Sequence, residues 1–201
     1  MKYSQNDEEN VVKNYFNGKI GTFLDVGSND GKTLSNTFAL SLSGWRGVLV
    51  EPSLKAFSAL RENYRGMKGF YFYNFALGIT NDEIDFYDSG SHLNLGDHGL
   101  LSTLSEEEKR RWPSQEYEKI RVKCFRWKAF VNRLSIKSFD FISIDAEGLD
   151  LAIIKQIDLQ ETSCVCIEWN GKDDLRDAYN AKMAGFKIIY TSPENLIYVR
   201  G

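Results

Sequence analysis

The chain of 201 residues has a small net charge, few cysteines and histidines, and no long apolar run. No stretch approaches the ~18 apolar residues of a membrane span, so we expect no transmembrane segment. The opening residues, MKYSQNDEEN, are too polar for a secretory signal, which favours a cytoplasmic protein. A formal net charge of −3 gives no overall reason to bind nucleic acid. The absences therefore favour a soluble protein whose partners are not nucleic acids or membranes.

The three cysteines are an odd number, which does not favour a disulfide framework. Cys164 and Cys166 alternate in an apolar run, so both thiols lie on one face of a strand. Together with Cys124, they are interpreted as small core residues in a reducing compartment rather than as a metal pair.

An apolar strand at 22–26 runs into a turn that contains Gly27, and a second apolar strand ends at Glu51. In an open α/β sheet, ligands bind beyond the carboxyl ends of the strands. The spacing from Asp25 to Glu51 is close to the roughly 20 residues expected of a ribose-binding acid. This pattern indicates an adenosine-containing ligand. The rival role for Glu51 is to cap the following helix.

The turn lacks the G-x-G-x-x-G pattern of dinucleotide sites and carries two acids, Asp25 and Asp30. Carboxylates would repel a pyrophosphate. They suit a ligand with a cationic amino group and a sulfonium, such as S-adenosylmethionine. A methyl-donor site is therefore favoured over a nicotinamide site, and a purely structural turn is the remaining alternative.

Strands and helices alternate along the chain, which predicts a mainly parallel sheet covered on both faces and finished by an antiparallel hairpin. We expect one α/β domain over residues 1–201, with a helical segment at 1–20. A helix is expected at 33–43, and a strand at 84–87 is expected beside the one at 69–75. Residues 88–127 are expected to form a lid or an acceptor-side insertion.

Several short motifs occur in order along the chain. They are Tyr3-Ser-Gln, Phe23-Leu-Asp-Val-Gly-Ser-Asn-Asp-Gly, Ser35-Asn-Thr37, Gly44-Trp-Arg-Gly47, Val50-Glu-Pro52, Ala76-Leu-Gly78, Ile144-Asp-Ala-Glu-Gly148 and Ile167-Glu168. Together they resemble the FkbM-type methyltransferases, a branch of the S-adenosylmethionine-dependent class, over most of the chain. The resemblance implies a three-layer α/β/α, Rossmann-like fold with a mostly parallel seven-stranded sheet and a C-terminal antiparallel hairpin.

The resemblance also assigns most of a donor site. Asp25 would hold the methionine amino group, Glu51 would bind the ribose hydroxyls, and Asp145 would face both the methionine and the acceptor. Residues of the first turn and of two further strand ends complete the expected cofactor-binding set, which is Asp25, Gly27, Ser28, Asn29, Glu51, Pro52, Ser53, Asn74, Ala76 and Asp145.

Methyl transfer to an alcohol needs a base or a metal to remove the hydroxyl proton. Asp145, Glu168 and Asn170 follow buried strands, with Glu147 nearby, and oxygen ligands of this kind suit Mg²⁺ or Mn²⁺. The alternative is that no metal binds and that these acids only hold the methionine or cap helices.

The catalytic candidates are therefore Asp145, Glu147, Glu168 and His98. The last is one of only two histidines, which both lie in the Gly-containing stretch 88–103. An imidazole there is able to accept a hydroxyl proton. His92 is the second histidine candidate, and a solvated loop histidine is the plainer interpretation of either.

By resemblance, the expected activity is O-methylation of a sugar hydroxyl in a glycan or a glycosylated small molecule. N-methylation is disfavoured because Asp145-Ala-Glu-Gly148 stands where those enzymes carry Asn/Asp-Pro-Pro-aromatic. The alternatives are a binding module that has lost catalysis and a nicotinamide-dependent oxidoreductase. The 88–103 stretch, the 105–127 segment or a second subunit of a homo-oligomer would shape the acceptor pocket.

Overall fold

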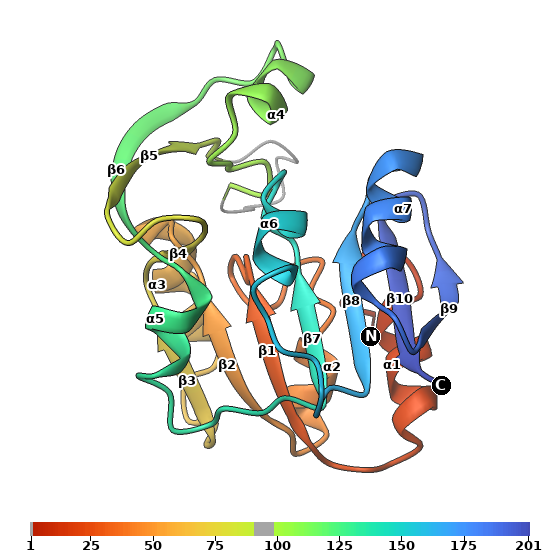
Figure 1. Ribbon diagram of the computed structural model, residues 1–201. Coiled ribbons are helices and arrows are strands. Elements are labelled where there is room, and N and C mark those ends of the chain that lie inside the picture. Colours follow the sequence, from red (N-terminus) through yellow and green to blue (C-terminus); the bar gives the residue numbers. More distant parts are fainter. Residues whose placement is uncertain (1, 91–98) are drawn as a thin grey trace.

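The computed structural model describes residues 2–90 and 99–201 and contains a seven-stranded sheet with the order β3-β2-β1-β7-β8-β10-β9 (Figure 1). The first five strands in that order are parallel, and β10 runs antiparallel to both neighbours. The fold class expected from the sequence is confirmed. The strands are β1 Thr22–Val26, β2 Arg46–Val50, β3 Phe70–Tyr73, β7 Phe141–Ile144, β8 Cys164–Glu168, β9 Phe186–Thr191 and β10 Asn195–Arg200.

The direction of chain crossover reverses at β1, which lies between β2 and β7. From β1 the chain moves outward to β2 and β3, and later it returns to the other side of β1 with β7 and β8. Such a switch point leaves a crevice at the carboxyl ends of the central strands, where open α/β sheets bind ligands. The topology therefore points to the ends of β1, β2 and β7.

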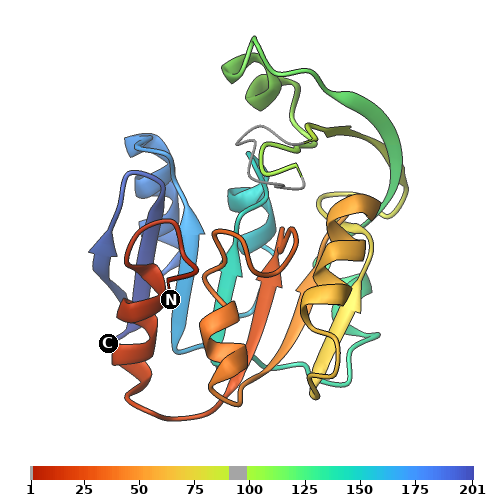
Figure 2. The ribbon, with the colours of Figure 1, turned by 180° about the vertical axis from the view of Figure 1, so that it is seen from behind.

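Helices cover both faces of the sheet, as the two opposite views show (Figures 1 and 2). One face carries α1 Glu8–Phe16, α2 Phe38–Leu42 and α3 Leu54–Asn63. The other carries α5 Trp127–Val131, α6 Asp150–Ile154 and α7 Asp173–Lys182. Alternating residues of β1 divide between the two cores: Phe23 packs in the first and Leu24 in the second. Among the described residues, no helix is long and apolar enough to cross a membrane.

A second, three-stranded sheet with the order β4-β6-β5 lies beyond the carboxyl end of the main sheet. Its strands are β4 Ala76–Leu77, β5 Glu83–Asp88 and β6 Glu118–Phe125, and α4 Glu106–Arg111 lies in the connection between β5 and β6. The prediction that 84–87 would pair beside 69–75 is wrong. The chain leaves the main sheet at Asn74, and β5 pairs antiparallel with β6 over six residue pairs.

The helix expected at 33–43 also begins later, at Phe38. Asp30 accepts hydrogen bonds from the backbone N–H of Lys32 and of Thr33, at 2.8 and 2.7 Å, which holds the preceding residues in a turn. Leu34 then takes a left-handed φ of 55°. Ser35 Oγ accepts from the N–H of Thr37 at 3.2 Å and of Phe38 at 3.1 Å, just before the helix begins. Local side-chain bonds of this kind compete with helix formation.

The expected burial of the cysteines is confirmed. Cys124, Cys164 and Cys166 are all free thiols, and all are buried.

Candidate functional site

Polar side chains replace apolar ones toward the carboxyl ends of the three central strands. Asp25, Ser143 and Cys166 are register partners across β1, β7 and β8. Side chains two residues apart share a face of a sheet, so Asp145 and Glu168 follow on the same face at the strand ends. The sheet thus brings two of the predicted acids together on rigid elements.

The turn after β1 depends on the absence of a side chain at Gly27. Its φ is +76°, and a Cβ there would lie 1.7 Å from the carbonyl oxygen of Asp145. The N–H of Gly27 donates to the carbonyl of Val50 at 3.0 Å, and the N–H of Asp145 donates to that of Val26 at 2.9 Å. Glycine therefore lets three strand ends meet at one point.

Asp25 is buried below this turn, and its carboxylate accepts a 2.6 Å hydrogen bond from Thr37 Oγ1. Burial raises the pKa of Asp25 to about 6, although the Thr37 bond opposes the shift. An uncompensated buried carboxylate of this kind favours a cationic ligand group.

Glu51 is buried at the end of β2, and both carboxylate oxygens accept backbone hydrogen bonds. Oε2 accepts from the N–H of Asn29 at 2.8 Å, and Oε1 accepts from the N–H of Ser53 at 2.7 Å. Burial raises the pKa of Glu51 to about 8, the two backbone bonds oppose the shift, and repulsion from Asp88 and Asp25 adds to it. The capping role is thus present. A carboxylate has about four acceptor positions, so capping does not exclude ribose binding.

A cavity of about 600 Å³ opens above Glu51. Six of the residues predicted to bind the cofactor line it, and its other walls are largely apolar. The six are Gly27, Asn29, Glu51, Pro52, Ala76 and Asp145, and the apolar walls include Val26, Val50, Phe75, Leu77, Phe86 and Leu104. An apolar slot with a carboxylate at one end is the form expected of an adenosine pocket.

Four of the predicted cofactor-binding residues do not line this cavity. Asp25 lines a neighbouring cavity instead. Ser28 also lines that neighbouring cavity, and its Oγ donates to Val50 O at 3.1 Å. Ser53 caps α3 by accepting from the N–H of Ala56. The Asn74 amide donates to the carbonyl oxygens of Glu51 and Pro52, at 2.9 and 3.0 Å, so it fixes the backbone at the end of β2.

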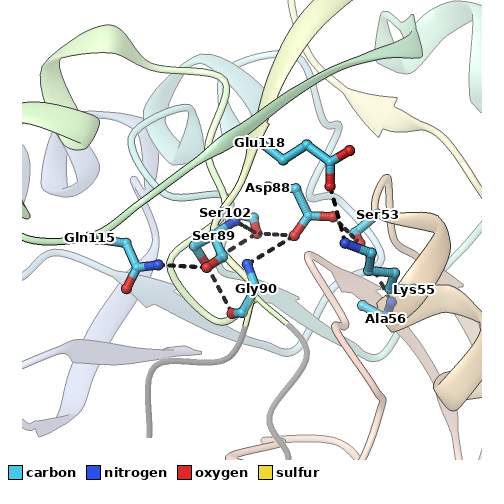
Figure 3. Close-up of polar contacts among 9 residues, drawn as sticks. All are labelled: Ser53, Lys55, Ala56, Asp88, Ser89, Gly90, Ser102, Gln115 and Glu118. Carbon is cyan, nitrogen blue, oxygen red and sulfur yellow. Dashed lines mark hydrogen bonds and ion pairs between the residues drawn. The ribbon is translucent and has the colours of Figure 1, made fainter.

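Asp88, the last residue of β5, contacts Ser53 on one side and Gly90 and Ser102 on the other (Figure 3). Its Oδ2 accepts from Ser53 Oγ at 2.8 Å, while Oδ1 accepts from the N–H of Gly90 at 3.1 Å and from Ser102 Oγ at 3.4 Å. Gly99, Leu100, Ser102 and Leu104 line the cavity. Asp88 thus ties this wall to the start of α3.

A second cavity of about 1510 Å³ shares Gly27, Asn29, Leu100, Asp145 and Glu147 with the first. It extends from Asp25 to Glu168 and Asn170 and reaches Arg111 and Trp112 on the other side. The described structure therefore contains two connected cavities, one largely apolar and one largely acidic.

Three carboxylates cluster in the second cavity: one oxygen each of Asp145, Glu147 and Glu168 lies within 4.8 Å of the others. Asp145 opens onto the cavity, yet the surrounding protein removes enough water to raise its pKa to about 7, with repulsion from Asp150 and Asp25 adding to the shift. Burial and mutual repulsion also raise the pKa values of Glu147 and Glu168 well above their ordinary value.

Glu147 is presented by a strained turn, since its φ is +45°. Asp150 holds the turn by accepting from the N–H of Ala146 at 2.9 Å and of Gly148 at 3.1 Å. Thr103 Oγ1 donates to the carbonyl of Glu147 at 2.6 Å. The segment after residue 99 therefore packs directly on the acidic turn.

Helix α4 is fixed over the same turn by Glu108. The carboxylate accepts from Lys172 Nζ at 2.6 Å and from Arg111 Nη1 at 3.3 Å. Although burial opposes the shift, these two cations hold the pKa of Glu108 below its usual value. Arg111 and Trp112 are thereby placed at the wall of the acidic cavity.

The other predicted residues have different outcomes. His92 and His98 lie outside the described residues. Asn170 lines the acidic cavity, and its side chain hydrogen-bonds Glu168. Glu147 joins Asp145 and Glu168 in the three-carboxylate cluster. Sequence reasoning missed Asp88, whose only signal was an acid at the end of an alternating strand.

A family model described as the methyltransferase FkbM domain matches residues 25–185. The chain belongs to the FkbM methyltransferase family. It is therefore an S-adenosylmethionine-dependent methyltransferase, and the oxidoreductase alternative is rejected. The matched region includes the first turn, Glu51 and the three clustered carboxylates. No sequence among the curated proteins is significantly similar to the chain.

Solved methyltransferase structures share the fold at low identity. PH1948 of Pyrococcus horikoshii, provisionally named an RNA methyltransferase, has a TM-score of 0.54 at 12% identity, over 96% of this chain and 81% of that one. The ribosomal protein L11 methylase of Lactobacillus delbrueckii subsp. bulgaricus has a TM-score of 0.50 at 15% identity, over 96% and 77%. Their different acceptors mean that the fold does not define the acceptor of this FkbM-family protein.

Proposed function

We propose that the protein transfers a methyl group from S-adenosylmethionine to a hydroxyl of a sugar, in a glycan or a glycosylated small molecule. The observation that carries the proposal is the junction of the two cavities. Asp145 and Glu147 line both, so a donor methyl group at that junction would face the acidic cavity. The sugar class rests on the family resemblance.

In this proposal the adenosine occupies the first cavity. Glu51 accepts hydrogen bonds from the two ribose hydroxyls, and the adenine lies between Pro52 and the apolar wall around Phe75 and Phe86. The methionine portion turns past Gly27 into the second cavity, toward Asp25. Both buried carboxylates then gain partners that favour their ionised forms.

The reaction is an in-line displacement, in which an oxygen lone pair of the acceptor attacks the methyl carbon as the carbon–sulfur bond breaks. The sulfonium becomes a neutral thioether, and the hydroxyl proton passes to a carboxylate of the Asp145, Glu147 and Glu168 cluster. Raised pKa values make these groups better bases at neutral pH than ordinary carboxylates.

The same cluster fits an oxygen-ligated divalent cation, since one oxygen of each of three carboxylates lies within 4.8 Å of the others. Asp145, Glu147 and Glu168 would hold Mg²⁺ or Mn²⁺, with Asn170 beside them. Such an ion would supply Lewis acidity that lowers the pKa of the acceptor hydroxyl.

The wall opposite the acids is suited to a sugar. Trp112 is 38% exposed and lines the acidic cavity, where its ring offers a flat apolar surface to a pyranose. By contrast, Trp127 is buried in the core and is not available to a ligand.

The proposal is tested with donor that carries an isotopically labelled methyl group and a panel of glycans and glycosides, each product being mapped by mass spectrometry and NMR. We expect a methyl ether on a sugar oxygen. Glu168→Gln should lower kcat by about 100-fold or more, as expected for loss of a general base. The exposed Glu161→Gln is the matched control and should be unaffected. Label on nitrogen or carbon would contradict the proposal.

Two further experiments test whether a metal ion or a histidine, rather than the carboxylate cluster alone, activates the acceptor hydroxyl. If turnover persists in EDTA and added Mg²⁺ does not raise it, the metal part of the proposal is rejected. If His98→Ala keeps a normal kcat while Glu168→Gln does not, the base lies in the carboxylate cluster rather than at His98.

A further inference from the structure

Asn36 carries a buried polar atom that has no partner. The residue is 8% exposed and lines the acidic cavity, and no described group lies within hydrogen-bonding distance of its Oδ1. A buried carbonyl oxygen without a hydrogen bond costs free energy, so native structures rarely retain one without a reason. The position of Oδ1 therefore indicates a missing donor.

The rest of the Asn36 side chain is held firmly. Its Nδ2 donates to Ser143 Oγ at 3.4 Å and lies 3.5 Å from Cys166 Sγ. These two residues belong to the same strand register row as Asp25. The amide thus lies across the row of polar side chains at the ends of the strands, and its nitrogen is occupied by the sheet.

The flanking residues fix the backbone on both sides of Asn36. Ser35 Oγ accepts from the N–H of Phe38 at 3.1 Å, and Thr37 Oγ1 donates to Asp25 Oδ2 at 2.6 Å. Thr37 therefore binds one oxygen of the same carboxylate that is expected to meet the methionine. Asn36 and Asp25 both line the cavity, so a residue with an unpartnered neutral acceptor and a buried anion border the same space.

We propose that Asn36 Oδ1 accepts a hydrogen bond from the α-ammonium group of the bound donor, together with the carboxylate of Asp25. The inference rests on the proposed donor site and deepens it, because it assigns a binding residue specific to the amino group of the methionine portion. An ammonium has three N–H donors and no acceptor, which matches a site of acceptors. A second carboxylate at position 36 would add repulsion to Asp25, whereas an amide oxygen does not.

The electrostatics of the cavity favour this occupant. Its lining includes five acidic residues, and among the described lining residues only Arg111 is cationic. The five are Asp25, Asp145, Glu147, Glu168 and Glu194. A ligand carboxylate placed near Asn36 would meet this negative field, while an ammonium is attracted by it.

The test compares four ligands by isothermal titration. S-adenosylhomocysteine carries both the amino group and the carboxylate, its deaminated analogue lacks the former, its decarboxylated analogue lacks the latter, and methylthioadenosine lacks both. Asn36→Ala should weaken the two amino-bearing ligands about tenfold or more, as for loss of a hydrogen bond to a charged group. The affinities of the other two ligands should change by no more than about twofold.

Control variants distinguish direct ligand binding by Asn36 from a purely structural role of this residue. Asn36→Leu fills nearly the same volume, so it should give the same ligand pattern if the alanine variant does not fold. Asn180→Ala, whose side chain bonds Tyr198 on the far side of the sheet, should change none of the four affinities. Glu51→Ala should weaken all four, because each contains the ribose.

An equal loss for all four ligands at Asn36→Ala would mean a structural role and would overturn the inference, as would no loss at all. A loss confined to the carboxylate-bearing ligands would overturn it too, since the amide would then face the carboxylate. If the wild-type protein binds none of the four, the proposed donor site itself fails.

Discussion

Gly27 in the first turn and Glu51 at the end of β2 hold the proposed donor site together. Gly27 allows the end of β7 to come alongside β1, and Glu51 receives the N–H of Asn29 from the same turn. The turn, β2 and β7 are therefore locked together before any ligand binds. Such preorganisation reduces the entropy that is lost on binding.

Replacing Gly27 by alanine should destabilise the protein severely and abolish donor binding, because the Cβ would overlap the Asp145 carbonyl. The matched control is Gly66→Ala: Gly66 has a similar φ of +81°, but no atom lies within 4 Å of its Cβ position. The control should cost only the ~1–2 kcal/mol of a left-handed non-glycine residue. Urea unfolding of both variants gives the difference, and similar losses would contradict the steric argument.

At the residue scale the sequence was a good guide for strand-end acids. Asp25, Glu51 and Asp145 follow or end apolar runs. The carboxyl ends of parallel strands lie together at one edge of an open sheet, so these acids were expected to be neighbours. Asn74 and Ser53 were also expected near the adenosine, but their polar atoms bind the backbone or Asp88 instead. Side-chain direction depends on neighbouring segments, which the local pattern does not contain.

At the scale of elements, the sequence predicted the strands better than their pairing. Alternation in 84–87 identified β5 correctly, but its partner is β6, across a long connection. An alternating pattern shows only that one face of the strand is covered. The pattern would be the same whether the strand paired with residues 69–75 or with β6. The late start of α2 has a similar origin, since Asp30 and Ser35 form local turns that compete with the helix.

The second sheet supports a wall of the proposed adenosine cavity through Asp88, which accepts from Ser102. Both of its oxygens accept from donors, so asparagine, which has only one acceptor atom, cannot replace both bonds. Asp88→Asn should therefore loosen the wall at 99–104 and weaken S-adenosylhomocysteine binding by about tenfold. Asp85→Asn on the same strand is the matched control, because Asp85 only pairs with the exposed Lys119 and Arg121. Isothermal titration decides, and equal affinities of the two variants would reject this role.

Over the whole molecule, the acidic residues are not spread evenly. A formal charge of −3 hides a concentration of buried or crowded carboxylates at one edge of the sheet. Composition alone gave no sign of this, because the fold brings together acids that are far apart in the sequence. When no ligand is bound, the ionised carboxylates at this edge have no cationic partner, and their burial and mutual repulsion destabilise the folded protein.

Glu51 makes this consequence measurable. Its pKa is about 8 in the folded protein and near 4.5 when exposed, so the folded state binds more protons between these values. The stability it contributes is therefore fully present below about pH 4.5 and is lost as the pH rises toward about 8. For one such group, the free energy of unfolding changes by at most about 1.4 kcal/mol per pH unit.

We expect the free energy of unfolding of the ligand-free protein to fall between about pH 5 and about pH 8, with Glu51→Gln showing a shallower fall because its side chain does not ionise. Glu62→Gln, which alters an exposed pair with Arg65, should retain the wild-type slope. Chemical denaturation across this pH range gives the three slopes. Saturating S-adenosylmethionine should flatten the wild-type curve, because ribose hydroxyls donate to ionised Glu51. A wild-type slope that Glu51→Gln leaves unchanged would assign the pH dependence to other carboxylates.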